Sequence, residues 1–283
     1  WASLSDRAGL YDIGRDVGFD ASGNVYVCGE AVQNSTNTDF VTIKYNSAGT
    51  QQWAILKSGP GSRLDQPFAL AMDGTNVVVA GQSFTGSANS DYMTVTYNTA
   101  GAEQWTRTYN AVGGIDTPTD VFVDASGNIA VTGQSFGGLA EDFDYATILY
   151  NSAGTQQWIN RYNGPDSELD KANAVIIDAA GNVIITGRST GVGSGEDYAT
   201  ILYDFAGTEV WVRRYNGSGA NQFDEATDIA LDAAGDIYVT GASNEGTGNS
   251  NDYTTIKYDV AGNLIWVARF DGPAGNTDDA KAM

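Results

Sequence analysis

DASGNIAVTGQSFGGLAEDFDYATILYNSAGTQQWINRYNGP, the stretch from Asp124 to Pro165, decides the fold, because the rest of the chain repeats it. The same pattern begins again at four other aspartates: Asp20, Asp73, Asp178 and Asp232. The copy that begins at Asp73 has one residue fewer in its first turn. A sequence that repeats one unit along its whole length is best treated as an array of similar structural units.

The tryptophans give the length of the repeat. All six occupy the same position in it: Trp1, Trp53, Trp105, Trp158, Trp211 and Trp266. By subtraction their separations are 52, 52, 53, 53 and 55 residues. A period of about 40–50 residues with strand-like content is typical of propeller blades. We therefore predict an all-β fold, a β-propeller of four-stranded antiparallel blades.

Each repeat contains four segments with the residue pattern of a strand. Apolar and polar residues alternate with a period of two, turn residues recur about every 8–12 positions, and no segment keeps a helical period. We expect almost no helix. In the repeat quoted above the predicted strands are Asp120–Val123, Ile129–Thr132, Tyr145–Tyr150 and a segment around Trp158.

The domain organisation follows from the phase of the repeat. We predict a single propeller domain over residues 1–283, or a propeller segment of a longer chain, with partial repeats flanking five complete ones. The complete units span approximately residues 12–64, 65–115, 116–169, 170–223 and 224–277. Trp1 lies in a fourth strand and Ala280–Met283 match the opening of a first strand. This phase predicts either an excerpt of a larger multidomain repeat protein or a ring with an irregular closure.

Charge and composition exclude several classes of function. The net charge of −21 comes from 35 acidic and 14 basic residues. It argues against nucleic acid as a partner and against binding to anionic lipid. No apolar run is long enough for membrane insertion. The chain has no histidine, so histidine-based triads and zinc sites are excluded. The single cysteine, Cys28, is expected to be a buried, inert thiol.

The recurring letters resemble a known family. Asp-x-x-Gly-Asn precedes a Val/Ile-rich strand ending in Thr-Gly, and Asp-Tyr-x-Thr-x-x-Tyr and Ala-Gly-x-x-x-Trp follow. The clearest copies are Asp124–Pro165, Asp178–Gly217 and Asp232–Pro273. This pattern resembles the bacterial seven-bladed β-propeller repeat, the SBBP repeat. The resemblance implies radial four-stranded blades in a secreted or cell-surface bacterial protein, and the family has no shared catalytic residue to carry over.

Positions where the repeats differ are the candidates for binding. One is the residue after the recurrent aspartate that lies just before each first strand, which in a propeller lies near the mouth of the central channel. The residues at this position are Ile13, Gln66, Thr117, Lys171, Glu225 and Asp279. The second is the loop between strands two and three: for example Glu30–Thr38, Gln134–Phe143 and Ala242–Asn251. A binding scaffold keeps its core and varies its loops.

Two further sets of aspartates recur, one before each first strand and one before each third strand. As hard oxygen ligands, four of the first set are candidate calcium ligands: Asp65, Asp116, Asp170 and Asp224. The alternative is structural. Such aspartates cap loops by accepting backbone N–H groups, or pair with the arginines that follow the tryptophans: Arg161, Arg214 and Arg269. No cofactor other than calcium is expected.

These observations predict a non-enzymatic, extracellular or cell-surface scaffold that binds a protein or glycan partner, as in adhesion, through its variable loops and channel mouth. Two alternatives stay open. One is a propeller lyase or hydrolase with an acidic channel site, assisted by a divalent cation, for which Glu225 and Asp228 are the residues to test. The other is a structural spacer in a surface fibre. The tryptophans are expected to pack between blades rather than to form a ligand platform.

Overall fold

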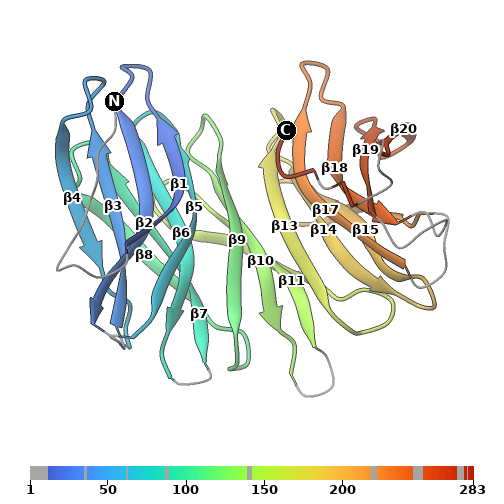
Figure 1. The fold of residues 1–283 in the computed structure, drawn as a ribbon, viewed down its shortest axis with the longest axis horizontal. Helices are drawn as coiled ribbons and strands as arrows, with labels where there is room; N and C mark the ends of the chain where they lie inside the picture. The colour runs from blue at the N-terminus through green and yellow to red at the C-terminus, as the bar shows by residue number, and fades with distance from the viewer. Residues whose placement is uncertain are drawn as a thin grey trace. The chain divides into compact units, whose positions relative to one another are not determined.

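The computed structural model describes residues 12–34, 37–61, 63–86, 89–138, 142–217, 222–244, 251–272, 277–278 and 280–283. These residues form twenty β-strands and no helix (Figure 1). The predicted all-β class and the four-strand repeat are therefore confirmed. Among the residues described, no helix has the length and apolar character needed to cross a membrane.

The first two repeats each form one four-stranded sheet. Sheet 1 contains β1 (Asp12–Phe19), β2 (Val25–Asn34), β3 (Asn37–Tyr45) and β4 (Gln51–Lys57). Sheet 2 contains β5 (Asp65–Met72), β6 (Asn76–Phe84), β7 (Ser90–Asn98) and β8 (Glu103–Tyr109). In both sheets the strands lie in chain order and each runs antiparallel to the next.

The remaining three repeats have the same order of strands. Sheet 3 contains β9 (Asp116–Val123), β10 (Ile129–Phe136), β11 (Phe143–Tyr150) and β12 (Gln156–Tyr162). Sheet 4 contains β13 (Asp170–Ile177), β14 (Val183–Gly191), β15 (Gly195–Tyr203) and β16 (Glu209–Tyr215). Sheet 5 contains β17 (Gln222–Leu231), β18 (Ile237–Asn244), β19 (Asn251–Tyr258) and β20 (Leu264–Phe270).

The strands are longer than their apolar patterns predict. In sheet 3 the first strand begins at Asp116 instead of Asp120, the second continues to Phe136, and the third begins at Phe143. Backbone hydrogen bonding does not depend on side-chain polarity, so the ladder continues through residues that break the alternation. The polar ends of the strands, where the candidate binding positions lie, are thus part of the sheets and not loops.

The predicted turns have the expected chemistry. In the turn after each first strand an aspartate accepts backbone N–H groups, as when Asp124 Oδ1 accepts those of Ser126 and Asn128, both at 2.8 Å. In the second hairpin turn Asn151 does the same for Ala153 and Thr155. Gly154 closes that turn with a φ of +73°, a conformation that glycine adopts without a Cβ clash.

A β-bulge interrupts the first strand in every sheet for which the register of that strand is given. The register shifts between Gly14 and Asp16, and at the equivalent points of sheets 2, 4 and 5. The residues that the shift passes over are Arg15, Phe68, Asn173 and Thr227. A bulge re-aims a side chain. This explains how Arg15 and Asn173 reach the groups described below.

One pairing was not predicted. The start of β15 pairs in parallel with the start of β17, through Gly195 with Gln222 and Glu196 with Phe223, so sheets 4 and 5 join into one eight-stranded sheet. The first two repeats show the same contact only as isolated parallel bridges, such as Thr38 with Leu64. β17 begins at Gln222, two residues before Asp224, whereas the other first strands begin at the aspartate equivalent to Asp224, and these two extra residues are the ones that pair with β15.

The chain divides into two compact units, and the boundary passes through sheet 3. Unit 1 contains Trp1–Val131 and Leu149–Gln156, and unit 2 contains Thr132–Ile148 and Gln157–Met283. Each has a core between neighbouring sheets. In unit 1, Tyr26, Cys28 and Phe40 of sheet 1 pack against apolar residues of sheet 2. In unit 2, Ile184 and Tyr198 belong to a cluster that continues into sheet 5.

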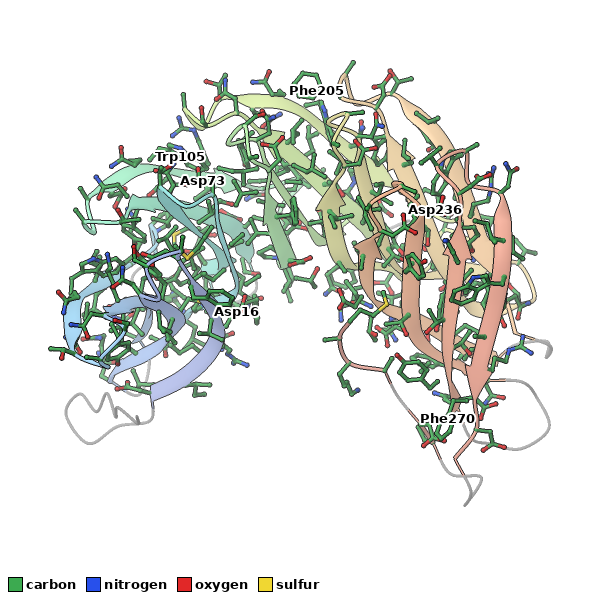
Figure 2. The ribbon with its side chains drawn as sticks, turned by 90° about the horizontal axis from the view of Figure 1, so that it is seen from above. Asp16, Asp73, Trp105, Phe205, Asp236 and Phe270 are labelled. Carbon is green, nitrogen blue, oxygen red and sulfur yellow. The ribbon has the colours of Figure 1, made fainter. Side chains whose placement is uncertain are left out.

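Polar links join neighbouring first strands as well. Asp16 on β1, labelled in Figure 2, accepts the backbone N–H of Leu70 on β5 at 2.7 Å. In unit 2, Asn173 Nδ2 donates to the backbone oxygen of Ala226 on β17 at 2.8 Å. First strands lie at sheet edges, where backbone groups lack ladder partners, and these side chains supply partners from the neighbouring sheet.

Candidate functional site

The candidate binding positions lie on the first strands, and three of them contact the preceding sheet. Gln66 Nε2 donates to Glu30 Oε2 at 3.2 Å, and Thr117 Oγ1 donates to Gln82 Oε1 at 2.9 Å, both within unit 1. In unit 2, Glu225 Oε1 lies 3.8 Å from Arg188 Nε. In each case the partner lies on a second strand, so these side chains bridge two sheets while staying half-buried.

The other three positions differ. Ile13 is 43% exposed, and Lys171 is half-buried on β13. Asp279 lies outside the described residues. The variable loops are also only partly described, because residues 35–36, 139–141 and 245–250 lie outside. The corresponding loop of sheet 4, between β14 and β15, is described completely.

A group of four charged residues lies in unit 2, and together with the exposed Val192 of the loop between β14 and β15 we call it the edge patch: Lys171, Arg188, Val192, Glu196 and Glu225. Lys171 and Arg188 are directly opposite each other on β13 and β14, so their side chains share one face. Arg188 lies 3.2 Å from Glu196 and 3.8 Å from Glu225. The Arg188 and Glu225 side chains are each 21% exposed. The patch thus presents charges of both signs that remain in contact with solvent.

Neighbouring residues hold the edge patch in place. Asn173, the bulge residue of β13, donates to Glu225 Oε1 at 2.9 Å. The Arg188 guanidinium lies over the Phe223 ring at 5.7 Å from its centroid. Burial and the nearby Glu225 carboxylate together raise the pKa of Glu196, against the opposing effect of Arg188. Val192, at the tip of the adjoining loop, is 73% exposed.

Unit 1 contains a smaller cluster of the same composition. Arg15, the bulge residue of β1, pairs with Glu30 and lies over the ring of Phe68, 5.8 Å from its centroid. Glu30 also accepts the hydrogen bond from Gln66. The Glu30 side chain is only 6% exposed and that of Arg15 is 34% exposed, so this cluster presents mainly its arginine to solvent.

The four calcium candidates serve as backbone acceptors. Three of them accept the N–H of a glycine in the link from the preceding repeat. The pairs are Asp65 with Gly59 at 2.6 Å, Asp170 with Gly164 at 2.5 Å and Asp224 with Gly217 at 2.9 Å. Asp116 accepts that of Ala111 at 3.2 Å. Within the described part of the chain, no three carboxylate or cysteine side chains gather where they could hold a metal ion. The geometry favours capping, and calcium binding at these residues stays a prediction.

The second set of aspartates supplies the arginine pairs. In sheet 3, Arg161 Nη2 lies 2.6 Å from Asp144 Oδ2, and in sheet 4 Arg214 Nη2 lies 2.7 Å from Asp197 Oδ2. The two carboxylate side chains are only 3% and 5% exposed. Arg269, the third arginine of the sequence pattern, donates to the hydroxyl of Tyr215. Buried charges are tolerated when paired in this way.

Each of these two arginine–aspartate pairs also includes a serine, which was not predicted from the sequence. Arg161 Nη1 donates to Ser135 Oγ and Arg214 Nη1 to Ser189 Oγ, both at 2.5 Å. The signal was present. A serine recurs two residues after the glycine of the second strand, and only the first repeat has alanine there: Ser83, Ser135, Ser189 and Ser243, against Ala31.

The tryptophans pack against the next repeat, as predicted. Four indole N–H groups donate to backbone oxygens in the second hairpin turn of the following repeat. The residues are Trp53, Trp105, Trp158 and Trp211, and the distances are 3.2, 3.1, 3.1 and 3.3 Å respectively. A Cβ on the glycine of that turn would lie within 3.2 Å of the indole. Figure 2 labels Phe205, the acceptor for Trp158, and Trp105. Trp266 is 38% exposed, and Trp1 lies outside the described residues.

Cys28 is fully buried in the core of unit 1, and burial raises the pKa of its thiol to about 12. A thiol with this pKa carries almost no thiolate at neutral pH, which agrees with the predicted inert role.

Comparisons with known proteins leave the family open. No family model matches the chain, and no curated protein sequence matches it. Among solved structures, a protein of unknown function from Bacteroides caccae is similar at 13% identity, covering 90% of this chain and 93% of its own, with a TM-score of 0.46. The extracellular domain of a putative hybrid two-component system from B. thetaiotaomicron is 10% identical, covering 98% of this chain and 35% of its own, with a TM-score of 0.45.

A gluconolactonase from Xanthomonas campestris is 13% identical to this chain. The match covers 80% of this chain and 68% of the gluconolactonase, with a TM-score of 0.42. Similarities this distant carry no functional argument, so function has to be argued from the residues of the chain itself.

The pH dependence of stability gives a test of the capping role. Burial, with help from the nearby Asp144 carboxylate, raises the pKa of Asp170 from 3.8 to about 6, despite its hydrogen bonds from Gly164 and Ser189. The folded state therefore binds more protons than the unfolded state between pH 4 and 6. The contribution of Asp170 is fully present below pH 4 and is lost as the pH rises through 6, by about 3 kcal/mol.

Urea unfolding of wild-type protein and Asp170→Asn, measured from pH 4 to 7, checks this. The stability of the variant relative to wild type is expected to increase with pH across this window, because asparagine does not titrate. Glu209→Gln, which removes an exposed acid in the same unit, is the control for the change in net charge. A constant difference for Asp170→Asn would mean that the carboxyl group titrates normally in the folded state.

Proposed function

We propose that this chain is a β-propeller scaffold of the SBBP type that acts outside the cell or at the cell surface of a bacterium and binds a protein or glycan partner without catalysis. The recurring Asp, Asn and Trp residues support this proposal, since their hydrogen bonds close the turns and link neighbouring sheets. The net charge of −21 suits a salty medium, in which counter-ions screen self-repulsion.

The edge patch is the observation that carries the proposal. Its charged groups are half-buried but in contact with solvent, and Asn173 and Phe223 fix the orientation of Glu225 and Arg188. Beside them Val192 exposes an apolar side chain on a short loop held by the hydrogen bond from Ser194 N to Gly191 O. An apolar anchor next to fixed polar groups is the usual composition of a recognition surface. Because the groups are preorganised, a partner would lose little by ordering them.

Binding to panels of glycans and of extracellular proteins tests the proposal. We expect binding by the wild-type chain that Val192→Asp and Arg188→Ala each weaken at least about tenfold, as loss of a central contact does. Val210→Asp is the matched control, because Val210 is 56% exposed in the same unit but lies on the outer strand β16. A chain that binds nothing in either panel, or whose binding survives both changes, is not a scaffold of this kind.

One observation favours an enzyme as the second candidate. Glu196 and Glu225 share Arg188, and the pKa of Glu196 is raised by burial and by Glu225. A carboxyl group with a raised pKa beside a second carboxyl group is an arrangement that acid–base hydrolases use. If polysaccharides or lactones are hydrolysed, Glu196→Gln and Glu225→Gln should each abolish turnover. Hydrolysis that depends on both residues would replace the scaffold proposal.

A further inference from the structure

The arginine of sheet 4 defines a binding arrangement for a guanidinium group. Arg214 Nη2 donates to Asp197 Oδ2 at 2.7 Å and to the backbone oxygen of Ser189 at 2.7 Å. Arg214 Nη1 donates to Ser189 Oγ at 2.5 Å. In sheet 3, Arg161 makes the same three contacts with Asp144 and Ser135. The acceptors come from the second and third strands, and the guanidinium comes from the fourth.

Sheet 2 has the same acceptors without the arginine. Ser83 lies opposite Asp91 on β6 and β7, as Ser189 lies opposite Asp197 on β14 and β15. The fourth-strand position that Arg214 occupies opposite Ala199 is occupied by Thr108 opposite Met93. Thr108 is exposed, and a threonine side chain is too short to extend across to the second strand. We call Ser83 and Asp91, together with the exposed fourth-strand position Thr108, the vacant cradle.

The acceptor groups of the vacant cradle are not satisfied within the described residues. Asp91 is 7% exposed, and no lysine or arginine described in the structure forms an ion pair with it. Its carboxylate receives one long hydrogen bond, from Asn89 Nδ2 at 3.4 Å. Ser83 is fully buried and its hydroxyl donates to the Asp65 carboxylate, but none of the described side chains or backbone groups donates to its hydroxyl oxygen. A buried carboxylate without a cation is costly, which favours an external partner.

The neighbouring sheet 1 does not repeat this arrangement. In sheet 1 the serine position is Ala31 and the arginine position is Leu56, which packs beside the core residues of that sheet. The third-strand carboxylate there, Asp39, accepts a hydrogen bond from Ser58 Oγ at 2.9 Å. Lys57 does not serve the vacant cradle either, because its ammonium group lies 2.9 Å from both carboxylate oxygens of Glu103.

We propose that the vacant cradle of sheet 2 binds the guanidinium group of an arginine side chain supplied by a partner protein. Sheets 3 and 4 show that these acceptors fit a planar, multiply donating cation. A calcium ion fits less well, because it requires six or more oxygen ligands. The strongly negative net charge attracts a basic segment to this surface. The site lies in unit 1 and is independent of the edge patch, which lies in unit 2.

The probe for this proposal is a capped Gly-Arg-Gly peptide, with Gly-citrulline-Gly as a neutral control of the same shape. Titration followed by calorimetry or NMR should show saturable binding of the arginine peptide and at least about tenfold weaker binding of the citrulline peptide, because the charge is lost. Asp91→Asn should weaken binding of the arginine peptide by a similar factor. Thr108→Arg should abolish it, because the introduced side chain fills the cradle, and should raise the melting temperature.

Two controls keep the result specific. Glu209→Gln removes one negative charge at an exposed site in unit 2 and should leave binding unchanged. Val192→Asp should also leave it unchanged, so that a failure of the proposed edge patch and a failure of this site are distinguished. Equal binding of both peptides overturns the proposal. Binding of the arginine peptide that Asp91→Asn leaves intact also overturns the proposal. A rise in melting temperature that depends on Asp91 and is produced by calcium but not by the arginine peptide does so too.

Discussion

Replacing Arg214 by leucine is expected to lower the free energy of unfolding by about 3–5 kcal/mol. The change leaves the Asp197 carboxylate, of which only 5% of the side chain is exposed, without its cation. It also removes the donors to Ser189 and to the hydroxyl of Tyr162. Breaking a buried pair by removing one partner costs more than the pair itself contributes, because the remaining charge cannot return to water. Urea denaturation at neutral pH measures the loss.

The double variant Arg214→Leu with Asp197→Leu separates the unpaired charge from the lost packing. Replacing both members of a buried ion pair by apolar residues is often close to neutral, so the double variant should recover most of the loss. Thr108→Arg is the converse change, which supplies a cation to Asp91 in sheet 2. If the double variant is as unstable as Arg214→Leu alone, the arginine stabilises the sheet mainly by packing.

The parts of the fold that could be predicted depend on interactions close in sequence. Asp124 caps its own turn within four residues, and Gly154 takes the positive φ that its turn requires. Such local rules repeat in every copy, so a single chain provides several independent examples of each. The tryptophan contacts span about one repeat, but they also recur, which made a packing role the stronger interpretation of Trp105 and its equivalents.

The candidate site could be predicted only in part, because its contacts depend on the distance between neighbouring sheets. Gln66 reaches Glu30, which lies 36 residues earlier, and Asn173 reaches Glu225, which lies 52 residues later. The sequence pattern placed Gln66 and Glu225 just before the first strands but contained no information on which second-strand residue each would meet. The bulge at Asn173 could not be seen either, because a bulge changes the register without leaving a distinctive residue type.

The arginine networks were the least predictable feature. The sequence suggested that Arg214 pairs with an aspartate, but two sets of aspartates were available, at the starts of the first and third strands. The structure shows pairing with Asp197, of the second set, together with Ser189. Which aspartate an arginine meets depends on the side of the sheet to which its strand directs it. That side follows from the register of four strands, which the pattern of a single strand does not determine.

Replacing Trp211 by alanine is expected to lower the free energy of unfolding by about 3–5 kcal/mol, the usual cost of deleting a buried tryptophan side chain. Trp211 is 6% exposed, its ring lies against Gly262 and under the Arg213 guanidinium, and its N–H donates to Val260 O at 3.3 Å. The alanine variant loses the apolar contact between sheets 4 and 5 as well as this hydrogen bond.

Two further variants show which contact matters, again by urea denaturation. Trp211→Phe keeps most of the apolar area and loses the N–H donor, so it should cost only about 1–1.5 kcal/mol. Trp266→Ala should cost less than about 1 kcal/mol, because Trp266 is 38% exposed and donates to no hairpin turn within the described residues. Equal losses for Trp211→Ala and Trp266→Ala would contradict the docking role, since burial by the following turn is the main difference between the two sites.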